Sequence, residues 1–175
     1  MTRKPTRRAC VRLKDPGLSE TPLVKGLVST RAERQGVPMT AFISHTSIDC
    51  RNAYELSEWW KKVLEYVDDP DDPNEPGHEE CWIQRPDGGH PLLFIEVPEG
   101  KQVKNRIHFD LRPSAGTRDE ELQRLLDLGA RQVDDQRNED GTGWVVLADP
   151  EGNEFCILRS QEEVDTSKAD IDHGG

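Results

Sequence analysis

The sequence predicts an α+β protein made of two similar halves, each with the order strand, helix and about three strands. A short stretch with β-branched residues begins the first half at residues 41–48, and alternating polar and apolar residues begin the second half at residues 105–111. Apolar residues at helical spacing follow each of these strands, and pairs of short strands end both halves. His45 and His108 lie in the middle of the two first strands, so the sequence repeats with a period of about 63 residues.

Composition limits the classes of protein that this chain can represent. Its 175 residues suffice for one domain with a hydrophobic core, or for two small modules that share one. The net charge of −11 argues against a general nucleic-acid or membrane-surface partner. No apolar run approaches the roughly 20 residues that cross a bilayer. The four cysteines form no CxxC pair, which predicts a cytoplasmic protein without a disulfide framework.

The first 38 residues are predicted to be a disordered basic extension. They hold nine lysines and arginines against three acidic residues, and they show neither a helical nor a strand period. A basic arm could contact an acidic partner or nucleic acid, but the lack of a hydrophobic pattern favours disorder. A strand pattern begins directly after Met39, which is therefore a candidate start of the protein. The domain is expected over residues 39–160, followed by a disordered tail at residues 161–175.

The first half begins with strand 41–48, in which alternation places His45 on the same face as its neighbours two residues away. A helix is predicted over residues 52–64, because N-x-x-E at its start resembles a capping box. Its apolar stripe includes two tryptophans, for which a core position is favoured over a ligand platform. The stripe consists of Leu56, Trp59, Trp60, Val63 and Leu64.

An acidic, proline-containing stretch at residues 65–80 separates this helix from the next strands. Its prolines and its charge repulsion exclude a helix. A solvated loop is favoured over a Ca²⁺ site, because the spacing lacks the glycine and the terminal glutamate of an EF-hand. A short strand is expected near residues 66–67. Residues 81–84 and 92–97 are predicted to pair around a Pro-Asp-Gly-Gly turn.

The second half repeats this order. One face of strand 105–111 carries Arg106, His108 and Asp110, and the other carries Ile107, Phe109 and Leu111. A T-x-x-E capping box opens a helix over residues 117–128, with Gly129 as its stop and a weak strand at residues 131–135 after it. Residues 144–148 and 155–158 form a hairpin around Asp-Pro-Glu-Gly-Asn, whose residues favour a turn.

The closing hairpin, GTGWVVLADPEGNEFCIL, resembles that of the vicinal oxygen chelate superfamily of glyoxalases, bleomycin-resistance proteins and dioxygenases. Further matching pieces are FISHTSIDCRNAYELSEWWKKVL, VKNRIHFDL and RLLDLGARQV. The chain looks most like actinobacterial glyoxalase-like domain proteins. The resemblance covers about residues 40–160, with module one at about 40–98 and module two at about 104–160. It implies two paired βαβββ modules whose mixed sheets curl around a shared cavity.

The resemblance also implies a divalent metal site, because the metal-using relatives take ligands from the first and last strands of each module. His45 and His108 match the two histidine ligands, and Glu96 could match the acidic ligand that also acts as the catalytic proton shuttle. Such a set suits Zn²⁺, Ni²⁺, Mn²⁺ or Fe²⁺. The family's remaining ligand is usually a glutamate, but Cys156 stands at that position. As a thiolate it favours softer metals, and as a thiol it is a small buried hydrophobic residue.

Two function classes follow from the resemblance. One is a metal-dependent lyase, isomerase or dioxygenase on a small oxygenated substrate, in which the ion would polarise a carbonyl. The other is a metal-free protein that binds or sequesters a small molecule, like the bleomycin-resistance proteins. The two histidines favour the first class, and the missing glutamate favours the second. In both classes Arg106, Asp110 and Cys156 are expected to line the substrate pocket, and a homodimer is the implied assembly.

Overall fold

The computed structural model of the protein describes residues 41–172, with side chains as far as residue 169. The predicted basic extension at residues 1–38 lies outside this part of the chain. No helix within the described residues is long and apolar enough to cross a membrane. In chain order the elements are β1 (Thr46–Cys50), α1 (Ala53–Leu64), β2 (Val67–Asp68), β3 (Glu80–Gln84), β4 (Leu92–Glu96), β5 (Asp110–Leu111), α2 (Arg118–Asp127), β6 (Arg131–Arg137), β7 (Gly143–Ala148), β8 (Glu154–Leu158) and α3 (Gln161–Asp172).

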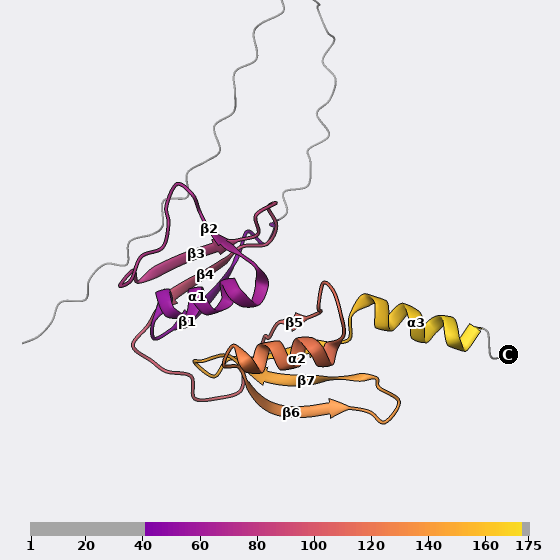
Figure 1. Ribbon diagram of the computed structural model, residues 1–175. Helices are drawn as coiled ribbons and strands as arrows, with labels where there is room; N and C mark the ends of the chain where they lie inside the picture. Colours follow the sequence, from indigo (N-terminus) through magenta and orange to yellow (C-terminus); the bar gives the residue numbers. More distant parts are fainter. Residues whose placement is uncertain (1–40, 173–175) are drawn as a thin grey trace, which may run out of the picture. The chain divides into compact units, whose positions relative to one another are not determined.

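Two four-stranded mixed sheets form the architecture, one in each half of the domain (Figure 1). The strand order is β1-β4-β3-β2 in the first sheet and β5-β8-β7-β6 in the second. In each module the first strand runs parallel to the last strand, and the other neighbours are antiparallel. The predicted α+β fold of two βαβββ modules is therefore confirmed.

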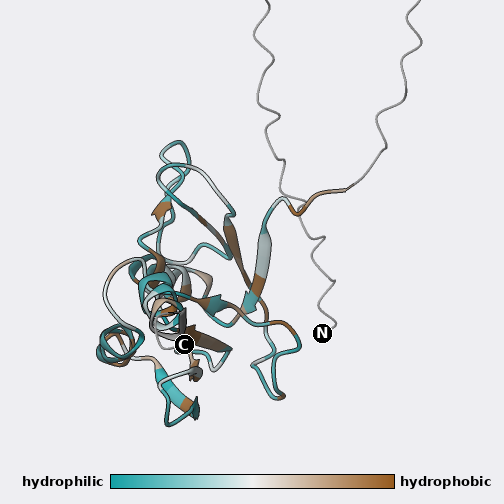
Figure 2. Cartoon of the chain, turned by 90° about the vertical axis from the view of Figure 1, so that its right-hand side faces the viewer, coloured by the Kyte–Doolittle hydropathy of each residue, from teal (hydrophilic) through white to brown (hydrophobic). Residues whose placement is uncertain are grey.

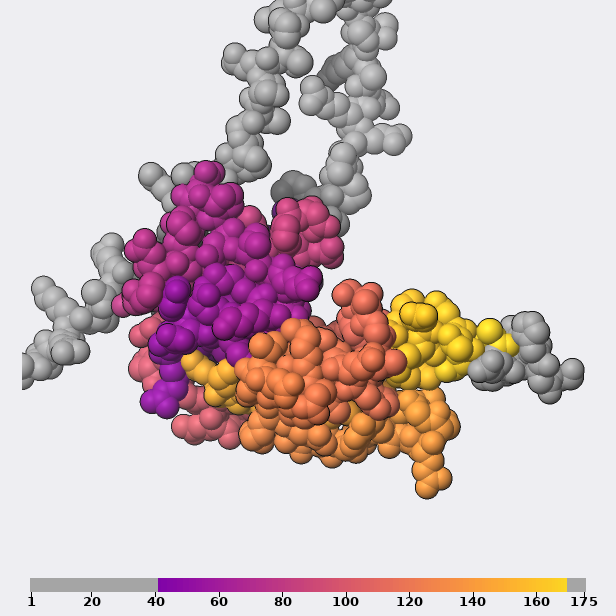
Figure 3. Space-filling model, in the orientation of Figure 1, coloured from indigo at the N-terminus to yellow at the C-terminus, as the bar shows by residue number. Residues whose placement is uncertain are grey.

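Helix α1 packs on the first sheet and also against the second module. Asn52 caps the helix, its side chain accepting the backbone N–H of Glu55 at 3.0 Å. The buried Trp60 ring lies 5.6 Å from Phe109 and 5.2 Å from Phe155, measured between ring centroids. The tryptophans of α1 are core residues, as predicted. The two modules are accordingly in direct contact (Figure 3), and hydrophobic residues gather on the strands beside the helices (Figure 2).

Helix α2 begins and ends where the sequence predicts. The Thr117 backbone N–H donates to the Glu120 carboxylate at 2.9 Å, and the Glu120 N–H donates to the Thr117 hydroxyl at 3.2 Å. These two bonds are the predicted capping box. Gly129 follows the last turn with a φ of 99°, the left-handed conformation that favours glycine after a helix.

Helix α3 (Gln161–Asp172) lies within residues 161–175, which were predicted to be a disordered tail. The Ser160 hydroxyl accepts the Glu163 backbone N–H at 3.2 Å, and the Ser160 N–H donates to the Glu163 carboxylate at 2.7 Å. The same carboxylate accepts the N–H of Arg118 at 2.8 Å, so α3 is tied to the start of α2. This capping box was readable as S-x-x-E, but no apolar helical stripe follows it, and the pattern alone therefore predicted no helix.

The first strand of each module is shorter than predicted. β1 begins at Thr46, and β5 comprises only Asp110–Leu111, because pairing starts only where β4 or β8 lies alongside. His45 and His108 therefore lie before their strands rather than in the middle of them. Ile107, which was predicted to face the opposite side from His108, is exposed.

Candidate functional site

The second sheet has one face in the core and another that lines a cavity. On β8, Phe155 and Ile157 are buried in the core, and alternation therefore turns Cys156 to the other face. Strand register brings residues of β7 alongside it on that face. The side chains on this cavity face are Trp144, Val146, Glu154, Cys156 and Leu158.

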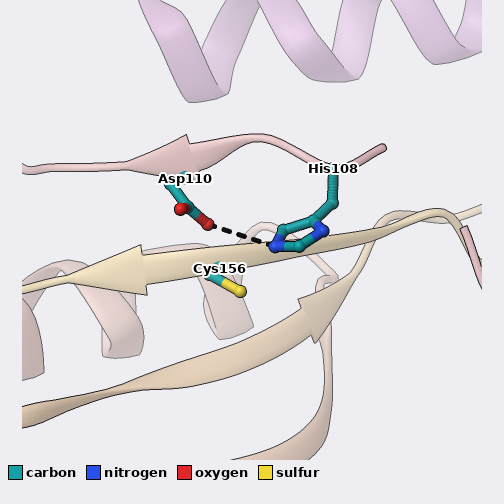
Figure 4. A group of neighbouring side chains, drawn as sticks. All are labelled: His108, Asp110 and Cys156. Atoms are coloured by element: carbon teal, nitrogen blue, oxygen red, sulfur yellow. Dashed lines mark ion pairs between the residues drawn. The ribbon is translucent and has the colours of Figure 1, made fainter. Parts of the chain in front are cut away.

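Three potential metal ligands converge on this face. The ligand atoms of His108, Asp110 and Cys156 all lie within 4.8 Å of one another. The Nε2 atom of His108 is 3.3 Å from Oδ1 of Asp110, and Asp110 is the strand partner of Cys156. Figure 4 shows the three side chains pointing toward one another from β5, the segment before it, and β8. We refer to these residues as the His-Asp-Cys cluster.

The thiol of the cluster lies in an environment that opposes its ionisation. Burial is the main cause, and with the negative charge of Asp110 it raises the pKa of Cys156 to about 11. The positive charge of Lys104 acts in the opposite direction. Without a bound cation, Cys156 is therefore a neutral thiol at pH 7.

Two cavities share His108 and Glu154 in their walls. The smaller one has a volume of about 300 Å³ and is lined by Lys104, His108, Asp110, Trp144, Val146, Glu154, Cys156 and Leu158. The larger one has a volume of about 530 Å³ and is lined by Thr46, Ser47, Ile48, Asp49, Trp60, Asn105, Ile107, His108, Phe109, Asp149, Asn153 and Glu154. Both volumes fall within, or at the lower limit of, the range of small-molecule sites.

His45 lies on the first module, outside the cluster. Its Nδ1 atom is 2.6 Å from the hydroxyl of Ser44, and its ring centroid is 5.2 Å from that of Trp82. It does not line either cavity described above, although Thr46 next to it lines the larger one.

Glu96 ends β4 opposite Cys50 and is exposed. Leu92 and Phe94, four and two residues before it on the same strand, are buried in the hydrophobic core. Alternation from these two residues directs Glu96 to the same face, which is the α1 face of the sheet. The combination of Glu96 with the two histidines as one ligand set stays a prediction.

The structure brings together two of the three residues that were predicted to line the substrate pocket. Asp110 and Cys156 lie beside His108, whereas Arg106 is exposed and lines neither cavity. A ligand role for Asp110 was not predicted. The signal was present, because His108 and Asp110 are two residues apart and alternation places both on one face.

The donor atoms of the His-Asp-Cys cluster fit a divalent ion. Imidazole nitrogen, carboxylate oxygen and thiolate sulfur are the three ligand types found in zinc sites, and a carboxylate with an imidazole also suits manganese. The cluster borders a cavity, so an ion held by these residues would be accessible to substrate or water.

Sequence comparison decides the family. The model of the glyoxalase-like domain matches residues 45–158. This chain belongs to the glyoxalase-like domain family. The family places it in the vicinal oxygen chelate superfamily, as its sequence suggests. No similar sequence was found among curated proteins.

Solved structures share the fold of this glyoxalase-like protein. The fosfomycin resistance protein FosX from Listeria monocytogenes, in a complex with Mn(II) and 1S,2S-dihydroxypropylphosphonic acid, is 15% identical with a TM-score of 0.52, covering 71% of this chain and 94% of that one. FosX from Mesorhizobium loti is 13% identical with a TM-score of 0.51, and the match covers 74% of this chain and 99% of that one. A glyoxalase/bleomycin resistance protein/dioxygenase family enzyme from Burkholderia phytofirmans is 17% identical with a TM-score of 0.50. The match covers 67% of this chain and 97% of that one.

Proposed function

We propose that this glyoxalase-like protein is a metal-dependent lyase or isomerase that acts on a small oxygenated substrate in the smaller cavity. His108, Asp110 and Cys156 would hold the ion. The observation that carries the proposal is the convergence of their three ligand atoms within 4.8 Å on a cavity wall. The Mn(II) complex of FosX, which shares the fold, supports including manganese among the ions to be tested.

The ligand types favour Lewis-acid chemistry over dioxygen chemistry. Non-haem iron oxygenases commonly use two histidines and one carboxylate, whereas this cluster has one histidine, one carboxylate and one thiol. A divalent ion, when bound, would polarise a substrate carbonyl and stabilise negative charge on its oxygen.

The chain's own residues supply orientation, proton transfer and exclusion of water. Asp110 lies 3.3 Å from the imidazole of His108 and is the carboxylate placed to accept a substrate proton, the role predicted from the sequence for Glu96. Trp144, Val146 and Leu158 form an apolar wall that limits the access of water to this side of the cavity.

Calorimetric titration of metal-free protein with Zn²⁺ and Mn²⁺ tests the proposed ligand set. We expect His108→Ala, Asp110→Asn and Cys156→Ser each to weaken binding by about tenfold or more, since each removes a ligand. Glu96→Gln and His45→Ala serve as the controls, because neither residue is in the cluster. Unchanged affinity in the three cluster variants, together with loss in the two controls, would replace this ligand set with the one predicted from the sequence.

Cys156→Glu tests the effect of having a cysteine where the family usually has a glutamate ligand. It restores the usual acidic ligand on β8, and we expect it to raise the affinity for Mn²⁺ or Ni²⁺, which favour oxygen and nitrogen ligands over sulfur.

The second candidate function is metal-free binding of a small molecule. The observation that favours it is the neutral, buried thiol at the position of the family's glutamate. Absence of metal binding in both the natural protein and Cys156→Glu, with the fold intact, would support this function and contradict the enzymatic one.

A further inference from the structure

We infer that the smaller cavity takes an amphipathic anion, whose charged group binds Lys104 and whose apolar body lies against Trp144, Val146 and Leu158. The inference rests on the proposed function, because it names the substrate class of the same cavity. The shared chemistry is a carboxylate or a phosphonate on a small apolar framework.

Lys104 is a cation of this cavity that has no anionic partner in the part of the chain that the structure describes. Within the described residues it makes no hydrogen bond and no ion pair, although its side chain lines the cavity. Lys101 nearby differs, because its Nζ atom lies 2.8 Å from the Glu154 carboxylate. A lysine without a partner can exchange its hydration for a ligand's anionic group without breaking an existing ion pair.

The carboxylates of the cavity are already engaged. Glu154 has Lys101 as its counter-ion and also accepts the Asn105 backbone N–H at 3.0 Å. Asp110 lies beside His108 in the cluster. With a divalent ion bound to Asp110 and the Cys156 thiolate, these three charges cancel, and the charge of Lys104 remains for the ligand.

The position of Lys104 places its charge near the reaction centre. Lys104 and all three residues of the His-Asp-Cys cluster line the same cavity of about 300 Å³. An anionic group bound to Lys104 would therefore lie beside the His-Asp-Cys cluster. This arrangement would orient the rest of the ligand toward the cluster.

Part of the cavity wall is apolar, formed by Trp144, Val146 and Leu158. Trp144 is 43% exposed, so its ring offers contact area to a ligand. The volume of about 300 Å³ suits a compact molecule with one short apolar or aromatic group. The chain's net charge of −11 repels anions in general, so binding of an anion here requires a local cation such as Lys104.

Benzoate, phenylphosphonate and the neutral benzamide are suitable probes, because they share an aromatic ring and differ in charge. Binding is followed through the indole N–H signal of Trp144 in ¹H–¹⁵N spectra, assigned with Trp144→Phe. The natural protein is compared with Lys104→Gln and Lys104→Arg. Lys168→Gln is the matched control, because Lys168 is an exposed lysine on α3 that lines neither of the two cavities. Resin-treated metal-free protein and Zn²⁺-loaded protein are both titrated.

We expect at least one of the two anions to bind about tenfold more tightly than benzamide. Lys104→Gln should remove that preference without changing benzamide binding, whereas Lys104→Arg and Lys168→Gln should retain it. The anion that binds more tightly identifies the group as carboxylate or phosphonate. Equal affinity for all three probes, or an anion preference that survives Lys104→Gln, overturns the inference. Lys104-dependent binding in metal-free protein that fails to bind Zn²⁺ would support the inference while contradicting the proposed metal function.

Discussion

Both carboxylate oxygens of Glu151 accept the backbone N–H of Arg51, at 2.9 and 2.7 Å, directly before helix α1. The N–H of Asn52 donates to the same carboxylate at 3.0 Å. Glu151 belongs to the turn between β7 and β8, so a residue of the second module satisfies donors at the start of the first module's helix. This contact connects the two modules through hydrogen bonds as well as through the shared core.

Glu151→Ala is expected to lower the free energy of unfolding by about 1–2 kcal/mol, because the N-terminal donors of a helix lose a charged acceptor. Urea denaturation measures the change. Glu139→Ala is the control, since Glu139 is exposed in the loop between β6 and β7 and makes no hydrogen bond or ion pair among the described residues. Equal unfolding midpoints for the two variants would show that the contact contributes no stability.

Asp149 organises the same turn from a buried position. Its carboxylate accepts the backbone N–H groups of Glu151 and Asn153, each at 2.9 Å, and the Trp60 indole N–H at 3.3 Å. Asp149→Asn would direct an amide donor toward some of these donors, so we expect a loss of about 2–3 kcal/mol in unfolding free energy. Asp71→Asn, in an exposed loop, should change it little. A loss below about 0.5 kcal/mol in Asp149→Asn would contradict the prediction.

Much of the fold was predictable because the information is local. The helices α1 and α2 carry their own caps and apolar stripes, and the closing hairpin carries its turn residues. The limits of β1 and β5 were not predictable, because they depend on where β4 and β8 lie alongside. Likewise α3 is stabilised through the contact of Glu163 with Arg118, a partner distant in sequence.

The candidate site shows the same division. His108 and Asp110 lie together, as alternation predicted, because two residues of one short extended segment need no tertiary information. The proximity of Cys156 followed only from the resemblance, since it depends on the parallel register of β5 with β8. Whether the Glu96 side chain faces α1 depends on which side of β4 the helix covers, and this cannot be predicted from the local sequence.

The acid sensitivity of the fold should depend on Glu163. Burial alone would raise the pKa of its carboxyl, but the hydrogen bonds from the backbone N–H groups of Ser160 and Arg118 outweigh burial and lower it. Because the folded-state pKa is depressed, the stabilisation is present above the unfolded value of about 4.5 and is lost as the pH falls through the folded value.

Thermal midpoints of the natural protein and Glu163→Gln, measured between pH 3 and 7, check this dependence. The difference between the two proteins should be largest near pH 7 and should shrink below about pH 4.5. Glu162→Gln, one residue away and exposed, is the control. A difference that stays constant with pH would show that ionisation of Glu163 contributes nothing.

The Cys156 thiol provides a test of the electrostatics around the His-Asp-Cys cluster in metal-free protein. Burial and the charge of Asp110 raise its pKa from 9.0 to about 11, whereas Lys104 acts in the opposite direction. Asp110→Asn should therefore lower the thiol pKa, and Lys104→Gln should raise it. The thiolate absorbance near 240 nm, recorded against Cys156→Ser in the same background, isolates this group from the other three cysteines. The folded state favours the neutral thiol, so its stabilising contribution is lost as the pH rises from about 9 to about 11.

Opposite shifts of the Cys156 pKa in Asp110→Asn and Lys104→Gln would establish that both residues act on the sulfur. Identical titration midpoints in all three proteins would show that burial alone sets the pKa, and would leave Lys104 too distant to position an anion beside the cluster.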